Sequence, residues 1–251
     1  MQSPCHAPLD DFLRHAADVP LDFSTATDCR YSSVGFLLLG AIVEKATGLP
    51  LPEILRREFF GPLRMQDTWL GVPENRADEL LPTVLPSILP AWQAEPDTGE
   101  DAVESGNDWG WNSRYWRTLG APWGGMISSA GDLGRYAAMM LSGGFSDAGE
   151  RILPNAVVQA AMANQTGELA AQADFVGAAR AWGLGWRQNW PGHSASFGDF
   201  LSPTAFGHWG ATGTTMWMDP ASQQFAAILT TTPYEESCSA IQRVSNIVTV
   251  L

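Results

Sequence analysis

The chain has 251 residues, of which 45% are hydrophobic and 16% are charged, which favours a folded domain with a sizeable core over bulk disorder. Its net charge of −13 repels phosphate backbones and anionic lipid headgroups, so nucleic-acid binding and attachment to anionic membranes are not expected. The three cysteines form no CxxC pair, so the sequence predicts neither a disulfide framework nor a zinc site.

The first two-thirds of the chain is predicted to consist of helices joined by long loops. Residues 34–47 are apolar on nearly all sides, which is typical of a buried helix. Ser33 is expected to cap its start and Gly48 to follow its end. Capping residues, prolines and helical spacing predict the other helices of this part over 52–60, 129–142 and 154–162.

Residues 71–123 form the least regular part, rich in proline, glycine and acidic residues, with tryptophans interspersed. A long loop inside a compact domain is often functional. The tryptophans are expected either to line a cleft or to pin the loop to the body of the protein. The candidates for cleft lining are Trp109, Trp111, Trp123 and Trp209.

The pattern changes near residue 180. Tryptophan and leucine alternate with glycine over 182–186, which indicates a strand, and further strands are expected over 206–218 and 224–232. Short turns imply antiparallel pairing, and a last helix is expected over 235–250. The predicted class is α+β, with a mainly helical lobe at 1–178 and three antiparallel strands plus a C-terminal helix at 179–251. Three strands leave a sheet edge uncovered, so the two parts together predict one incomplete domain.

The sequence lacks the common motifs of metal, phosphate-binding and GxSxG hydrolase sites. The four histidines have no metal-ligand spacing, and neither a glycine-rich phosphate loop nor GxSxG occurs, so no metal or cofactor is predicted. The longest apolar run is too short to span a bilayer, and no signal peptide is visible, which leaves the localisation undetermined.

Two segments stand out. Tyr31 stands at the mouth of the helix at 34–47, where the positive end of the helix would favour an ionised phenol and a general base. The structural alternative is a hydrophobic staple. His208 and Gly210 share one face of a predicted strand and can face one cleft, whereas the structural alternative is a glycine-rich bulge.

Together these segments resemble a known family. The stretches YSSVGFLLLGAIVEKATGLP, FFGPLRMQDTWLG, WGGMISSAGDLGRYAAMMLSGG and FGHWGATGTTMWMDP are similar in order and spacing to β-lactamase-related serine hydrolases. That family includes class C β-lactamases, penicillin-binding DD-peptidases and family VIII esterases. The resemblance implies a β-lactamase/transpeptidase-like fold and hydrolysis of a small ester, amide or β-lactam-like substrate through an acyl-enzyme.

The resemblance also assigns roles. Tyr31 matches the tyrosine that relays protons, and Ser33 stands where the family has asparagine. His208 replaces the lysine of the third motif, which favours an esterase or peptidase-like relative over a true β-lactamase. Gly210 belongs to the same motif, and the backbone N–H of Ala211 matches an oxyanion-hole donor.

One departure separates this sequence from the family. The family nucleophile is the serine of Ser-x-x-Lys, but the only lysine is Lys45, and Ile42 stands three residues before it. The first sheet strands and the nucleophile helix are therefore expected to be absent, and the chain is expected to be an inactive C-terminal portion. The alternatives are a stand-alone pseudoenzyme that binds a ligand or partner through the tryptophan-rich cleft, or another nucleophile such as Ser32 or Ser129. An uncovered sheet edge would also permit self-association.

Overall fold

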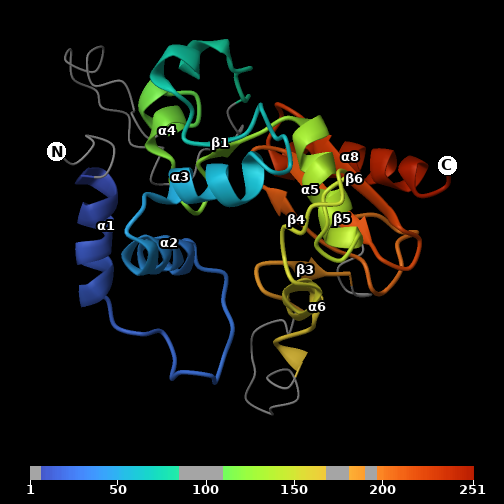
Figure 1. Cartoon of the computed structure of the whole chain (residues 1–251), viewed down its shortest axis with the longest axis horizontal. Helices are drawn as coiled ribbons and strands as arrows, with labels where there is room; N and C mark the ends of the chain where they lie inside the picture. The colour runs from blue at the N-terminus through green and yellow to red at the C-terminus, as the bar shows by residue number, and fades with distance from the viewer. Residues whose placement is uncertain (1–6, 85–109, 168–180, 190–196) are drawn as a thin grey trace.

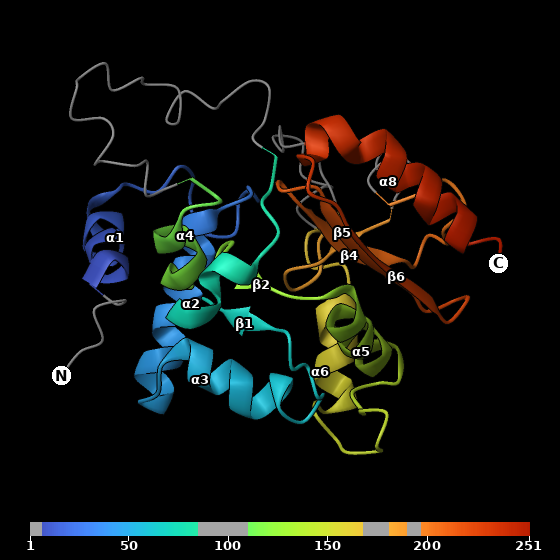
Figure 2. The same ribbon diagram turned by 90° about the horizontal axis from the view of Figure 1, so that it is seen from above.

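The computed structural model describes residues 7–84, 110–167, 181–189 and 197–251. Helices α1 to α4 lie on one side of the molecule, and the main sheet with α8 lies on the other (Figures 1 and 2). This arrangement confirms the α+β class. In chain order the elements are α1 (Ala7–Asp18), α2 (Ser33–Thr47), α3 (Leu51–Leu55), the π-helical turn η1 (Arg56–Phe60), β1 (Trp69–Leu70), the 3-10 helix η2 (Glu74–Glu79), α4 (Arg114–Leu119), β2 (Met126–Ile127), α5 (Ala130–Leu141), α6 (Asn155–Met162), β3 (Arg187–Gln188), β4 (Phe206–Gly210), β5 (Thr214–Asp219), β6 (Gln224–Leu229) and α8 (Tyr234–Val248).

The main sheet has four described antiparallel strands in the order β3-β4-β5-β6, where the sequence predicted three. The single strand expected over 206–218 is wrong, because the chain reverses between Gly210 and Thr214 to form the β4–β5 hairpin. Gly213 has φ of 86° in this turn, and a side chain there would overlap the carbonyl of Thr232. Glycine permits the turn that the strand pattern had concealed.

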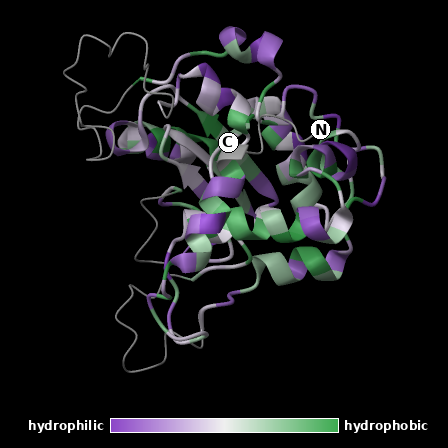
Figure 3. Cartoon of the chain, turned by 90° about the vertical axis from the view of Figure 1, so that its left-hand side faces the viewer, coloured by the Kyte–Doolittle hydropathy of each residue, from purple (hydrophilic) through white to green (hydrophobic). Residues whose placement is uncertain are grey.

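The two faces of the sheet pack against different helices. Phe206 and Met218 are paired across β4 and β5, and both belong to a core cluster with Met139 and Met140 of α5. Trp217, on the opposite face, belongs to a second cluster whose neighbours include Val248 at the end of α8. In Figure 3 the hydrophobic residues gather along the helices and on the strands between them. The sheet is therefore a middle layer between α5 and α8.

The start of α5 is tied to the segment that leads into β1. Ser129 caps the helix by accepting a hydrogen bond of 3.2 Å from the backbone N–H of Asp132, as its capping-box sequence predicted. The Asp132 carboxylate is buried and accepts hydrogen bonds of 2.8 Å from the backbone N–H of Asp67 and the hydroxyl of Thr68. Arg135 donates a further bond of 2.8 Å. One buried carboxylate thus joins the helix to a segment about sixty residues earlier in the chain.

Helix α2 departs from its prediction in two ways. Its N-cap is Ser32, whose hydroxyl accepts a hydrogen bond of 3.0 Å from the N–H of Gly35, so Ser33 is the first helical residue and not the cap. The expected burial on all sides is also wrong, since only α1 and α3 pack closely along it among the described elements. Leu37 is buried on the covered side, while 44–63% of the side chain is exposed on the other side at Val34, Leu38, Leu39 and Ile42.

No single helix of the described residues is long and apolar enough to cross a membrane. Helix α2 and the segment Leu51–Phe60 meet a length and composition test only as a pair, and that pair is bent by 78°.

The Asp132 carboxylate makes a clear stability prediction. Replacing it in Asp132→Asn removes the charge-assisted bonds to the N–H of Asp67 and the hydroxyl of Thr68, so the free energy of unfolding should fall by roughly 1.5–3 kcal/mol. Asp147→Asn is the matched control, because Asp147 makes only an exposed ion pair with Arg64 at 3.8 Å, and it should cost less than about 1 kcal/mol. Denaturant titration of both variants measures the difference. Equal losses would show that Asp132 does not hold α5 to the β1 segment.

Candidate active site

His208 is directed into a cleft by the register of β4 on β5. It pairs with Met216, and Gly210 pairs with Thr214, so both residues lie on the sheet face that also packs against α5. The part of this face that carries His208 and Gly210 borders a cleft of about 920 Å³. That volume is within the range of small-molecule sites. Threonines of β5 and of the segment that follows β6 line much of this cleft: Thr214, Thr215, Thr230, Thr231 and Thr232.

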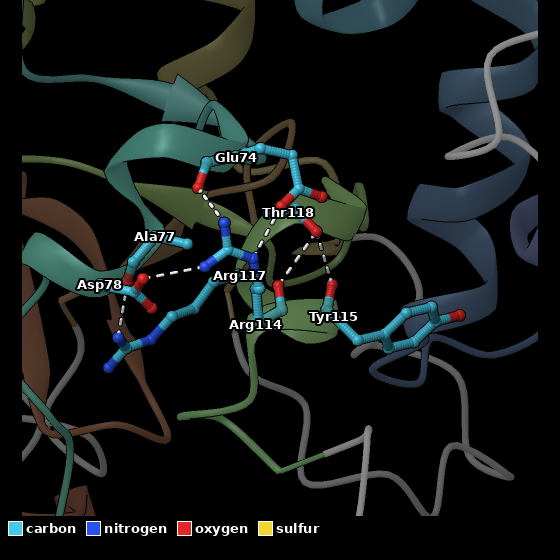
Figure 4. A network of polar contacts seen from close by, with 7 residues as sticks. All are labelled: Glu74, Ala77, Asp78, Arg114, Tyr115, Arg117 and Thr118. Carbon is cyan, nitrogen blue, oxygen red and sulfur yellow. Dashed lines mark hydrogen bonds and ion pairs between the residues drawn. The ribbon is translucent and has the colours of Figure 1, made fainter.

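The opposite wall of the cleft is held by a network between η2 and α4 (Figure 4). Arg114 donates hydrogen bonds to Glu74 at 2.8 Å and to Asp78 at 2.9 Å. Arg117 donates to the carbonyl of Ala77 at 2.9 Å and itself lines the cleft. These bonds join η2 to α4, and the end of η2 and the segment after it line the side of the cleft across from the sheet.

The hydrogen bonding of His208 fixes which nitrogen can accept a proton. Its Nδ1 lies 2.5 Å from the carbonyl oxygen of Trp209. A carbonyl only accepts, so Nδ1 carries the proton and Nε2 of the neutral ring keeps its lone pair. Burial lowers the pKa of His208 and the charge of Arg187 lowers it further, while the hydrogen bond to Trp209 opposes the shift. His208 is therefore a neutral imidazole at pH 7 with Nε2 as an acceptor.

Tyr31 reaches the same place from the distant helical side. Its ring centroid lies 6.0 Å from that of His208 and 6.4 Å from that of Trp182. The side chain is 64% exposed and stands immediately before the cap of α2. The structure thus brings together the two side chains that the sequence had marked separately.

Aromatic rings surround His208 beyond what the sequence indicated. The Trp182 ring lies 5.7 Å from it, and Trp209 stacks on Tyr234 at 4.4 Å. The guanidinium of Arg187 lies 5.2 Å from the Trp182 ring and 5.4 Å from the Trp209 ring. The strand predicted from the alternation at 182–186 is wrong in position, since the described strand is β3 at Arg187–Gln188 and Trp182 makes only an isolated bridge to Arg187. The alternation also gave no signal that this segment would meet His208.

The glycine and alanine of the motif lie at the start of the hairpin turn. Gly210 lines the cleft, and a Cβ at this position would stand 2.5 Å from the hydroxyl of Thr214. A larger residue at position 210 would therefore require the Thr214 side chain to move. Ala211 follows in the turn, and its carbonyl accepts a hydrogen bond of 3.0 Å from the N–H of Tyr234.

The other residues predicted to line the cleft or to take part in catalysis lie in different places. Trp111 lines the cleft. Trp123 does not line it: its ring packs 5.6 Å from Phe12 of α1 and 6.3 Å from Trp116 of α4. The loop expected at 71–123 is partly helical, since η2 and α4 lie within it. Trp109 lies outside the described residues. Ser33 is exposed at the first turn of α2.

The two serines considered as other nucleophiles are helix caps. Ser32 accepts the N–H of Gly35, and Ser129 accepts that of Asp132. Within the described parts of the chain, no group of three or more histidine, cysteine, aspartate or glutamate side chains could hold a metal ion.

A family model described as "Beta-lactamase" matches residues 2–248, which is nearly the whole chain. The chain belongs to the beta-lactamase family. Among curated relatives in this family, it is 27% identical to "N-acetylmuramyl-L-alanine amidase" of Bacillus subtilis (strain 168) over 237 residues, which cover 88% of this chain and 48% of the relative. The chain therefore spans about half the length of that curated relative.

Solved structures of the beta-lactamase type show the same fold. A penicillin-binding protein homologue from Caulobacter crescentus superimposes with a TM-score of 0.70 at 22% identity, over 97% of this chain and 66% of that one. The D-amino acid amidase of Ochrobactrum anthropi SV3 superimposes with a TM-score of 0.61 at 18% identity, over 97% of this chain and 68% of that one. The β-lactamase/transpeptidase-like fold is thus confirmed, and with it membership of a hydrolase family that acts on small molecules.

The lowered pKa of His208 predicts a pH dependence of stability. The unfolded chain protonates His208 at its ordinary pKa of 6.5, whereas the folded chain resists protonation until a lower pH. Stability from this group is complete above pH 6.5 and is lost as the pH falls through 6.5 towards the folded value. Thermal melts at about pH 7.5 and about pH 5.5 should therefore show a larger loss for the wild type than for His208→Asn.

His15→Asn is the matched control, since His15 is exposed on α1. This variant should keep the pH dependence of the wild type. If His208→Asn also keeps it, His208 is not held neutral by its surroundings.

Proposed function

We propose that the chain is the C-terminal portion of a serine hydrolase that cleaves an ester, amide or β-lactam-like bond through an acyl-enzyme. In this proposal the nucleophilic serine and its lysine come from outside these 251 residues, and the chain alone is inactive. One observation supports it above the others. Tyr31 lies 6.0 Å from His208 between ring centroids, and His208 lines the cleft although Tyr31 does not, while the sequence contains no Ser-x-x-Lys.

The roles follow from the positions of these groups. The incoming serine oxygen attacks the carbonyl carbon of the substrate, and its proton passes to the lysine one helical turn away. Tyr31 relays a proton to the leaving oxygen or nitrogen as its bond to the carbonyl carbon breaks, and Nε2 of His208 accepts a hydrogen bond in the same site. The backbone at Gly210 and Ala211 provides a donor for the oxyanion. Water then hydrolyses the acyl-enzyme. Ser33 at the start of α2 contacts the substrate or the lysine.

The neutral state of His208 favours an esterase or peptidase-like activity over a true β-lactamase. A lysine in this position would hold a permanent charge for a substrate carboxylate, and a neutral imidazole does not. The Bacillus relative is named as an amidase, which supports amides among the three bond types.

A second candidate is a pseudoenzyme that binds a small ligand without turnover. The cleft favours it, since a space of about 920 Å³ is lined by this chain although no Ser-x-x-Lys is present. Self-association is a further proposal, because β6 ends the described sheet and exposes Phe225 and Leu229 to 37% and 38%.

The isolated chain tests the main proposal. Incubation with a serine-directed fluorophosphonate and then peptide mapping should give no adduct, including at Ser32 and Ser129, and p-nitrophenyl ester hydrolysis should equal that of Tyr31→Phe. An adduct at either serine, with turnover that Tyr31→Phe reduces, would contradict it. The DNA upstream of the Met1 codon should also contain an in-frame Ser-x-x-Lys. Without one, and with a ligand-induced rise in melting temperature, the pseudoenzyme is the better account.

A further inference from the structure

Arg187 lies beside His208 but does not line the cleft. It is the first residue of β3 and pairs with Gly207 of β4, the residue before His208. Its guanidinium carbon lies 5.2 Å from the centroid of the Trp182 ring and 5.4 Å from that of the Trp209 ring. A guanidinium group is planar and stacks on indole faces through cation–π attraction. We call Arg187, Trp182 and Trp209 the Arg187 stack.

Both indole rings of the Arg187 stack also contact the imidazole. The ring centroid of His208 lies 5.7 Å from that of Trp182 and 6.2 Å from that of Trp209. The carbonyl oxygen of Trp209 lies 2.5 Å from Nδ1 of His208. The same cation therefore lies over both rings that flank the imidazole, and one of these rings belongs to the residue whose carbonyl accepts the imidazole proton.

The two indole rings are supported from different parts of the fold. The backbone N–H of Trp182 donates a hydrogen bond of 3.1 Å to the hydroxyl of Thr166, which follows α6. Trp209 stacks on Tyr234, the first residue of α8, at 4.4 Å and an interplanar angle of 13°. Helices α6 and α8 lie apart in both views (Figures 1 and 2). The guanidinium therefore joins two separately supported rings beside the imidazole.

The charge of Arg187 acts on His208 in the same direction as burial. Burial lowers the pKa of His208, the positive charge of Arg187 lowers it further, and the hydrogen bond to the carbonyl opposes both. The other titratable or charged groups described around this site are Tyr31, in ring contact with His208, and Glu79 and Arg117, which line the cleft. Among these groups, Arg187 is the one whose charge shifts the pKa of His208.

We propose that Arg187 is a positioning residue, which through the Arg187 stack holds the imidazole of His208 in one orientation and one tautomer, with Nδ1–H on the carbonyl of Trp209 and Nε2 left as an acceptor. The inference rests on the proposed function, in which Nε2 accepts a hydrogen bond in the site. Arg187 acts through His208 and not on the substrate, because it does not line the cleft. A lysine would supply the charge, but its compact ammonium group cannot stack as a plane on indole rings. The charge and the stacking can therefore be tested separately.

An NMR titration of the isolated 251-residue chain tests the positioning role. The resonances of His208 are those lost in His208→Asn, and the nitrogen chemical shifts distinguish its two tautomers. Arg187→Met removes both the charge and the planar group, so the midpoint of the His208 titration should rise towards 6.5 and the single tautomer should become a mixture. Arg187→Lys keeps the charge without the planar group, so its midpoint should rise less than in Arg187→Met, while the tautomers still mix.

Arg151→Met is the matched control, because Arg151 lies 4.8 Å from the centroid of the Phe145 ring in a cation–π pair that includes no residue of the site. This variant should keep the midpoint and the tautomer of the wild type. An unchanged midpoint and a single tautomer in Arg187→Met would overturn the proposal. If Arg187→Met does not fold, Arg187→Lys decides: a mixture of tautomers supports the proposal, and a single tautomer overturns it. Loss of folding in both variants would make Arg187 a residue of the fold alone, which overturns it as well.

The titration is independent of turnover, so the two proposals can fail separately. A fluorophosphonate adduct at Ser32 or Ser129, with turnover, would contradict the proposed function and leave the role of Arg187 intact. A wild-type titration in Arg187→Met would overturn the role of Arg187 and leave the proposed function intact.

Discussion

The register of β4 on β5 sets the geometry on which the candidate site depends. His208 lies opposite Met216, and this pairing turns its side chain to the face shared with α5 and the cleft. A slip of one residue would turn the imidazole to the face covered by α8. Gly207 and Gly213 hold the register from both ends, since a side chain at either would overlap a backbone carbonyl of a neighbouring segment. These two glycines thus fix the hairpin that the strand pattern of the sequence concealed.

Helix α2 positions Tyr31 of the candidate site, and it also has an unusual apolar side that is exposed. Its cap at Ser32 fixes where the helix begins, and so delivers Tyr31 to the rings around His208. The same helix exposes large apolar residues, among them Val34, Leu39 and Ile42. A helix that positions a functional residue must itself be held, and α1 and α3 hold only one side of it. The position of Tyr31 therefore depends on how firmly the neighbours of α2 hold this helix.

The electrostatics of the cleft follow from burial among aromatic rings. Trp182 and Trp209 remove water from His208, and Arg187 lies over both indole rings. Burial and a nearby positive charge both disfavour the imidazolium, so the ring is neutral and its Nε2 is an acceptor. Burial and the charge of Arg187 would also disfavour the charged form of a lysine in this environment. The substitution and its surroundings are consistent with each other, which supports a site that does not depend on a fixed charge from this strand.

The sequence by itself determined what depends on local chemistry. Capping residues predicted the start of α5 at Ser129 and the end of α2 at Gly48. The order of helix and strand patterns predicted the α+β class, and the order of motifs predicted the family. Local patterns failed where long-range contacts decide. The reversal at Gly213 depends on the approach of Thr232, the packing of Trp123 on Phe12 and Trp116 depends on α1 and α4, and Trp182 and Arg187 meet His208 only across strands. Only the tertiary structure could show that α1 and α3 leave part of α2 exposed. The hydrophobicity of a helix predicts that it buries apolar surface, but it does not predict which segment covers that surface.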